Sequence, residues 1–108
     1  MTTATSNNQQ IAQVIAQQLG GSVRKIALMV GARDFVAIEN GLQFSFKSCR
    51  KANKVRITLN SMDTYDVEFF KYNRRTFECP MVHEVSGAYC DMLTDVFESF
   101  TGLYLSLR

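Results

Sequence analysis

Hydrophobic and polar residues alternate with a period of two along three stretches in the middle of the chain. Leucine, phenylalanine, valine, isoleucine or tyrosine occupies every second position in residues 42–46, 55–59 and 65–69. This alternation is typical of β-strands that bury one face and expose the other. The pattern therefore predicts strands that belong to an antiparallel sheet with one apolar face.

The dipeptide Asn40-Gly41 lies between two apolar runs, which is the strongest short signal for a tight hairpin turn. A two-residue turn at this position pairs Ala37 with Phe44. The apolar residues that follow the turn then face the core. The same register places Val36 and Ile38 on the outer face of the sheet, where they are either exposed or covered by another segment.

A second hairpin is predicted across the loop of residues 60–64. A loop of this length keeps the apolar residues of both strands on one face. It places Arg56 opposite Glu68, an ion pair across the strands that contributes about 0.2–1 kcal/mol. Phe70 joins the outer face near Lys54.

The N-terminal part of the chain predicts a helix. Apolar residues recur three and four positions apart within residues 11–19. Asn7 or Asn8 is expected to cap the helix, and Gly20-Gly21 is expected to end it. Residues 1–6 are small and polar, so we expect them to be disordered.

Three further segments are predicted as strands. Residues 24–30, "RKIALMV", form a short apolar run that we interpret as a buried strand. Residues 76–85 favour a strand that Pro80 interrupts or confines to the edge of the sheet. Residues 103–108, "LYLSLR", are a short closing strand in this interpretation.

A last amphipathic helix is expected between a cap at Ser86 and a stop at Gly102. The predicted fold is therefore α+β, with a curved antiparallel sheet of about five strands built from hairpins. An N-terminal and a C-terminal amphipathic helix pack on the apolar face of this sheet. We expect residues 7–108 to form a single domain, because a chain of 108 residues has the usual length of one domain.

Charge is distributed unevenly, although the net charge is only +2. Every charge in "KSCRKANKVR", residues 47–56, is positive, and two more arginines follow the neighbouring strand. The candidate nucleic-acid-binding residues are Lys47, Arg50, Lys51, Lys54, Arg56, Arg74 and Arg75. Cations next to aromatic residues such as Tyr72 suit single-stranded nucleic acid. The alternative is a solvated loop, and no helix-turn-helix, zinc-finger or RNP motif decides between the two.

The segment from residue 78 to residue 98 carries only negative formal charges. Its helix, or alternatively the apolar outer face of the sheet, could meet a protein partner. The residues of this alternative interface are Val36, Ile38, Phe70, Asp91, Asp95 and Glu98. A solvated helix face and a covered apolar pair are the simpler interpretations.

Catalytic and metal-binding motifs are absent from the sequence. Cys79 and His83 are four residues apart, but no C-x-x-C pair supports a metal site, and no activated thiol is evident. Phosphate-binding glycine loops are also missing. We therefore expect no enzyme activity and no cofactor. The odd number of cysteines, the polar residues 1–10 and the lack of a long apolar run favour a cytoplasmic protein without membrane contact.

Several stretches resemble a family of small, uncharacterised proteins encoded by phages, prophages and plasmids. The resemblance runs from Leu19 to Leu105. It is carried by Met29-Val30-Gly31-Ala32, Glu39-Asn40-Gly41-Leu42, Lys51-Ala52-Asn53, Asp63-Thr64-Tyr65-Asp66 and Thr101-Gly102-Leu103. It transfers no catalytic or ligand-binding residue. It implies a mobile-element setting in a host cytoplasm, which favours replication accessories and modulators of host machinery.

These observations lead to two functional hypotheses. The first is a non-enzymatic binding protein that contacts nucleic acid through its basic loop, as a replication or recombination accessory. The second is a protein-directed modulator or inhibitor of a host defence complex, in the manner of anti-CRISPR proteins, or of a replication complex. A structural homodimer is a third interpretation of the apolar outer face.

Overall fold

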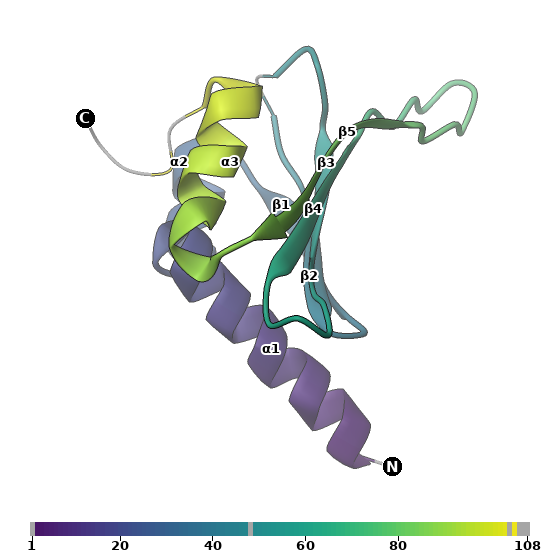
Figure 1. Cartoon of the computed structure of the whole chain (residues 1–108). Coiled ribbons are helices and arrows are strands. Elements are labelled where there is room, and N and C mark those ends of the chain that lie inside the picture. The colour runs from purple at the N-terminus through teal and green to yellow at the C-terminus, as the bar shows by residue number, and fades with distance from the viewer. Residues whose placement is uncertain (1, 48, 104, 106–108) are drawn as a thin grey trace.

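The computed structural model describes residues 2–47, 49–103 and 105, with side chains from residue 9 onward. Its helices are α1 (Thr2–Gly20), α2 (Val23–Val30) and α3 (Leu93–Thr101), with a single 3₁₀ turn at Cys90–Met92 before α3. Its strands are β1 (Arg33–Ile38), β2 (Gly41–Ser45), β3 (Lys54–Leu59), β4 (Tyr65–Phe70) and β5 (Met81–Ala88). Figure 1 shows these elements in order along the chain.

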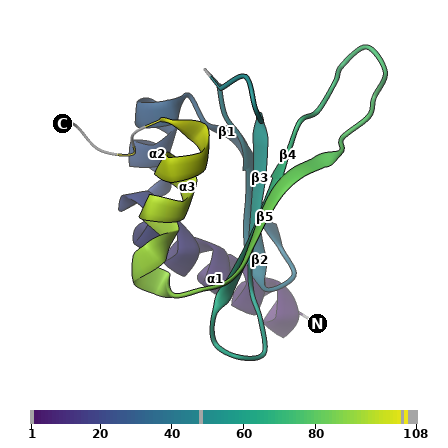
Figure 2. The same cartoon turned by 45° about the horizontal axis from the view of Figure 1, so that its top comes forward.

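The strands form one antiparallel sheet in the sequence order β1-β2-β3-β4-β5. The helices lie on one face of this sheet, and the opposite face is open (Figures 1 and 2). This arrangement confirms the predicted α+β class, with a sheet built from hairpins and helices from both ends of the chain. The helix α2 is an addition to that prediction.

The core lies between the sheet and the helices. Phe44 of β2, Phe69 of β4 and Phe97 of α3 are fully buried there. The ring centroid of Phe97 is 6.3 Å from that of Phe44 and 6.1 Å from that of Phe69. These distances fall in the range of favourable aromatic pairs, so the three rings join the C-terminal helix to the middle of the sheet.

The β3–β4 hairpin has the predicted register. Val55 pairs with Phe69 and Arg56 pairs with Glu68. The Nε atom of Arg56 lies 2.8 Å from the Oε1 atom of Glu68. Phe70 is on the outer face opposite Lys54, as expected.

The β1–β2 hairpin turns one residue earlier than expected. Its two turn residues are Glu39 and Asn40, and Ile38 pairs with Gly41. Asn40 takes the positive φ of 58° that the turn requires. Gly41 belongs to β2, where a Cβ atom would overlap the carbonyl oxygen of Ile57 in β3. The glycine is therefore needed for close strand approach, and the shift by two in pairing preserves the predicted faces.

The prediction of a strand at residues 24–30 was wrong, because this segment lies in helix α2. The side chain of Ser22 caps the helix by accepting a hydrogen bond from the Lys25 amide, at 3.1 Å. Gly31 ends it with a left-handed φ of 64°. Only Ile26 and Val30, four residues apart, are buried in α2, and that spacing is helical. A short apolar run fits either element, and here the Ser22 cap together with the burial of Ile26 gives a helix.

The boundaries of the other two helices also differ from those expected. Ser86 does not cap α3, because β5 continues to Ala88 and α3 begins at Leu93. Gly102 ends α3 as predicted, with a φ of 75°. At the other end of the chain, α1 begins at Thr2, ahead of Asn7 and Asn8.

The C-terminal segment is only partly described. The predicted closing strand includes residues 104 and 106–108, which lie outside the described residues. Leu103 and Leu105 do not belong to a strand, and Leu105 is buried against the core.

Candidate nucleic-acid interface

The basic stretch begins in the loop that joins β2 to β3, and Asn53 fixes the end of this loop. The backbone carbonyl of Asn53 accepts a hydrogen bond from the Phe46 amide, and its own amide donates to the Phe70 carbonyl oxygen, both at 2.9 Å. Ala52, the preceding residue, is fully buried. The end of the loop is thus joined to the strands on both of its sides.

The side chain of Asn53 extends this pairing to Tyr72, two residues beyond the end of β4. Its Oδ1 atom accepts from the Tyr72 amide at 2.8 Å, and its Nδ2 atom donates to the Tyr72 carbonyl oxygen at 2.9 Å. A side-chain amide has the same donor and acceptor as a backbone peptide, so Asn53 substitutes for a strand residue. Tyr72 is thereby held beside the start of β3.

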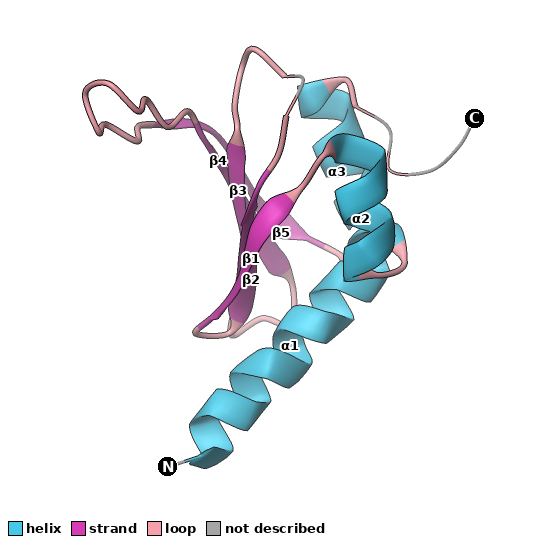
Figure 3. Cartoon of the chain, turned by 180° about the vertical axis from the view of Figure 1, so that it is seen from behind, coloured by secondary structure: helices cyan, strands magenta, loops and turns pink. Residues whose placement is uncertain are grey.

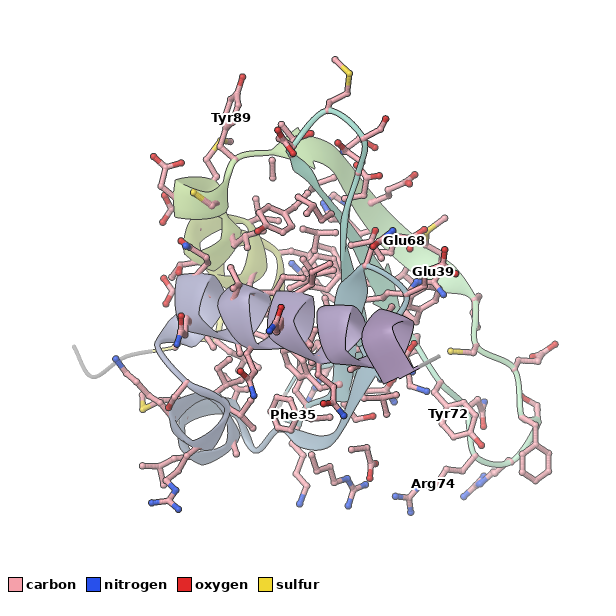
Figure 4. The ribbon with its side chains drawn as sticks, turned by 90° about the horizontal axis from the view of Figure 1, so that it is seen from below. Phe35, Glu39, Glu68, Tyr72, Arg74 and Tyr89 are labelled. Atoms are coloured by element: carbon pink, nitrogen blue, oxygen red, sulfur yellow. The ribbon has the colours of Figure 1, made fainter. Side chains whose placement is uncertain are left out.

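An open cleft of about 540 Å³ lies where these segments meet. Its charged residues come from three parts of the chain that the sheet brings together. They are Arg33, Lys47, Lys54 and Arg74, and among the described residues of the lining Asp34 is the one acidic residue. Tyr72 and Asn53 also line the cleft, and Figure 4 shows Tyr72 and Arg74 on the same side of the molecule. Four basic groups and one acidic group give the lining a formal charge of +3.

One cation of the cleft lies next to its tyrosine ring. The Nζ atom of Lys54 lies 5.4 Å from the centroid of the Tyr72 ring. Arg33 and Asp34 approach each other to 3.9 Å, but both side chains remain more than half exposed. A weak ion pair between exposed groups leaves the guanidinium of Arg33 accessible to a stronger anion.

Lys47, Lys54 and Arg74 are the predicted nucleic-acid-binding residues that the fold brings together in this cleft. Lys51 lies elsewhere. Its Nζ atom donates to the carbonyl oxygen of Phe100 at 3.3 Å and lies 5.4 Å from the centroid of that ring. A cation at the C-terminal turn of α3 complements the negative end of the helix, so Lys51 holds the loop against α3.

The remaining predicted basic residues also lie outside the cleft lining. Arg56 is on the open face of the sheet, where it pairs with Glu68 and stacks on Phe70 with a guanidinium-to-centroid distance of 5.0 Å. Arg50 is exposed in the β2–β3 loop, and Arg75 is exposed in the segment between β4 and β5.

Arg33 and Asn53 are cleft residues that the sequence did not suggest as functional. Arg33 is far from the basic stretch in the chain, but it pairs with Ser45, which in turn pairs with Lys54. The sequence could have indicated Arg33 only through the register of the first hairpin, which places Arg33 in line with Lys54. For Asn53 the only signal was its place within the basic loop.

The residues of the alternative protein interface divide between two surfaces. Val36 and Phe70 are both on the open face, but the row that runs from Val36 across the sheet passes through Gln43, Arg56 and Glu68. Val36, Ile38 and Phe70 therefore do not form one contiguous apolar patch.

The acidic residues belong to the helix side of the molecule. Asp91 is exposed in the 3₁₀ turn, and Asp95 lines a groove between β5 and α3. The Oε2 atom of Glu98 accepts a hydrogen bond from the Leu105 amide at 2.8 Å, so this carboxylate anchors the chain after α3.

The groove between β5 and α3 has a volume of about 440 Å³. Its walls include His83, Val85, Met92, Val96 and Phe100. The rings of His83 and Phe100 stack with an interplanar angle of 4° and a centroid distance of 4.4 Å. In the order of the described strands β5 is at the edge of the sheet, so the groove lies beside a strand with one unpaired side.

The described residues contain no group of three or more His, Cys, Asp or Glu side chains that could hold a metal ion. Cys49 is half-buried, and Cys79 and Cys90 are exposed free thiols. None of the described helices has the length and apolar character needed to cross a membrane.

Comparison with family models, with curated proteins and with solved structures finds no match to this chain.

Proposed function

We propose that this chain is a non-enzymatic nucleic-acid-binding protein that holds a single strand in the cleft between the start of β3 and Tyr72. The observation that carries the proposal is the lining itself. Arg33, Lys47, Lys54 and Arg74 line one cleft together with the aromatic residue Tyr72, and Asp34 is the acidic residue among its described lining residues. Basic grooves with aromatic residues bind single strands by phosphate neutralisation and base stacking.

The mechanism in the cleft has two parts. The cations contact phosphates and release counterions, which makes affinity depend on salt. The half-buried Tyr72 ring offers a face to one base, and Asn53 holds its backbone in place. Neither contact reads the edges of the bases, so little sequence preference is expected.

Fluorescence anisotropy with labelled single-stranded DNA, single-stranded RNA and duplex DNA tests this proposal. Three to four phosphate contacts predict a slope on the order of −2 to −3 when log affinity is plotted against log salt. The double variant Lys54→Glu/Arg74→Glu should weaken binding and flatten this slope, because it reverses two of the four cleft cations. Arg24→Glu/Lys25→Glu is the matched control with the same change in net charge, since both residues are exposed on α2 outside the cleft lining.

An equal loss of affinity in the Arg24→Glu/Lys25→Glu control would mean that net charge, rather than the cleft, governs binding. Absence of binding at low salt would refute the proposal outright.

The biological setting of the proposal comes from the resemblance to phage, prophage and plasmid proteins. In that setting the protein acts in the host cytoplasm as a replication or recombination accessory. Its stacking and phosphate contacts would cover a strand exposed during those processes.

A protein partner is the second candidate, and the groove between β5 and α3 is the observation that favours it. An extended segment could pair with the edge of β5 and insert an apolar side chain beside Val85 and Phe100. Asp95 on the groove wall and the nearby Asp91 favour basic residues next to that anchor. A modulator of a host defence or replication complex would use this surface.

Capture from nuclease-treated host lysate tests the second candidate. The captured protein should be lost when the bait carries Val96→Asp or Asp95→Lys, and it should be retained by Lys54→Glu/Arg74→Glu. A band that all baits retain would count against the groove. Light scattering measures the molar mass of the purified protein and so shows whether it forms a homodimer in the absence of a host partner.

A further inference from the structure

The segment of residues 71–80 between β4 and β5 projects beyond the sheet as an arm (Figures 1 and 3). It starts beside the cleft, because Tyr72 and Arg74 of the arm are cleft residues. Pairing between the Lys71 amide and the Pro80 carbonyl oxygen, at 3.1 Å, closes its base. The arm is therefore a continuation of the candidate binding surface.

Hydrogen bonds centred on Asn73 organise the tip of the arm. The Asn73 amide donates to the Glu78 carbonyl oxygen, and the Asn73 carbonyl oxygen accepts from the Phe77 amide, both at 2.8 Å. The Oδ1 atom of Asn73 accepts from the Arg75 amide at 2.9 Å. Because the turn is closed from within, the tip presents its side chains in a preorganised form.

Phe77 at this tip departs from two rules that a structural phenylalanine obeys. The residue is 77% exposed, although an aromatic ring stabilises a fold when it is buried. Its φ of +60° lies in the left-handed region, which bulky residues rarely occupy. A glycine or an asparagine would form this turn with less strain. Strained residues of this kind cluster where a protein contacts a ligand.

The neighbours of Phe77 indicate the chemistry of that ligand. Lys71, Arg74 and Arg75 give the arm three cations. Its acidic residue, Glu78, accepts a hydrogen bond from the Thr76 hydroxyl at 3.2 Å. One aromatic ring beside several cations suits a polyanion with planar groups. A single ring is too small an apolar surface for a membrane or an obligate protein contact.

We propose that Phe77 is a second base-stacking site, which takes an unpaired nucleobase of the strand whose phosphates contact Arg74 and Arg75. This inference rests on the proposed function, since the same strand would run from the cleft onto the arm. Exposed aromatic rings bind bases of any identity because every base has a π-face. A duplex keeps its bases stacked on one another and should not use this site.

The test compares three variants by anisotropy on single-stranded and duplex DNA. Phe77→Ala should weaken single-strand binding on the order of 5- to 100-fold, the range that loss of one stacked base produces. The salt slope should not change, because no charge is removed. Phe77→Tyr should retain the affinity. Met62→Ala is the matched control, since Met62 is 80% exposed on the loop between β3 and β4.

A 2-aminopurine base placed in the single strand gives a direct readout of stacking. Its fluorescence should change when the native protein moves the base from its neighbours onto Phe77, and this change should be lost with Phe77→Ala. The inference is overturned if the native protein binds single strands and Phe77→Ala binds within about two-fold of it. Failure of the native protein to bind any strand would instead overturn the proposed function, and this inference with it.

Stability measurements separate a binding defect from a folding defect. Phe77→Gly should raise the thermal midpoint, because glycine adopts the positive φ without strain, and should still lose single-strand affinity. A variant that gains stability and loses binding shows that the loss of affinity does not come from unfolding.

Discussion

Substitution of Asn53 by alanine should destabilise the fold and disorganise the cleft at the same time. The side chain makes two hydrogen bonds to the backbone of Tyr72, at 2.8 and 2.9 Å, in a partly buried site. A net contribution of about 0.5–1.5 kcal/mol per bond predicts a loss of about 1–3 kcal/mol in the free energy of unfolding. Incomplete access of water to the freed Tyr72 groups moves the value toward the upper end of this range.

Urea denaturation followed by circular dichroism measures this loss. With an m-value of about 2 kcal/mol/M, a loss of about 2 kcal/mol lowers the urea midpoint by about 1 M. Gln43→Ala is the control, because it removes a half-buried side-chain amide from the open face of β2. It should change the free energy of unfolding by less than about 0.5 kcal/mol.

The result also bears on binding. If Asn53 positions Tyr72, then Asn53→Ala should weaken single-strand affinity although it removes no charge. An Asn53→Ala midpoint equal to that of Gln43→Ala would contradict this prediction, since it would mean that these two hydrogen bonds do not hold Tyr72 beside β3.

Three further outcomes are expected. Gly41→Ala should cost about 1–3 kcal/mol of stability in thermal melts, because its Cβ would meet a backbone carbonyl that cannot move aside. A double-mutant cycle on Arg56 and Glu68, which are 39% and 20% exposed, should give a coupling of about 0.2–1 kcal/mol, and a larger value would contradict a surface pair. Burial raises the pKa of Tyr65 above its usual 10.0. The phenol therefore ionises first in the unfolded chain, and its contribution to stability is present below pH 10 and lost as the pH rises through the folded pKa. Tyrosinate absorbance measured against pH should show one phenol that ionises above the usual pH, and Tyr65→Phe should remove it. A titration curve that Tyr65→Phe leaves unchanged would contradict the assignment.

Local pattern determined much of the sheet. The alternation in residues 55–59 and 65–69, with a loop between them, was enough for the register that pairs Arg56 with Glu68. Period-two patterns specify a face because a slip of one residue would expose every apolar side chain. For the same reason Phe44 and Phe46 are buried although the first hairpin turns one residue early.

Where one hydrophobic pattern fits both a strand and a helix, the pattern alone does not determine the element, and tertiary contacts contribute to the choice. The apolar run at residues 24–30 fits a strand or a helix, and the Ser22 cap together with packing of Ile26 selects the helix α2. The distribution of the basic residues also depends on the fold. Lys51 and Lys54 are three residues apart in one charged stretch, but Lys51 contacts α3 and Lys54 faces the cleft.

The sequence by itself thus determined the fold class, the hairpins and the presence of a basic surface, because each follows from the order of neighbouring residues. The cleft was decided only by tertiary structure. Arg33 and Arg74 are separated by most of the sheet in sequence and converge through strand pairing, which no local pattern encodes.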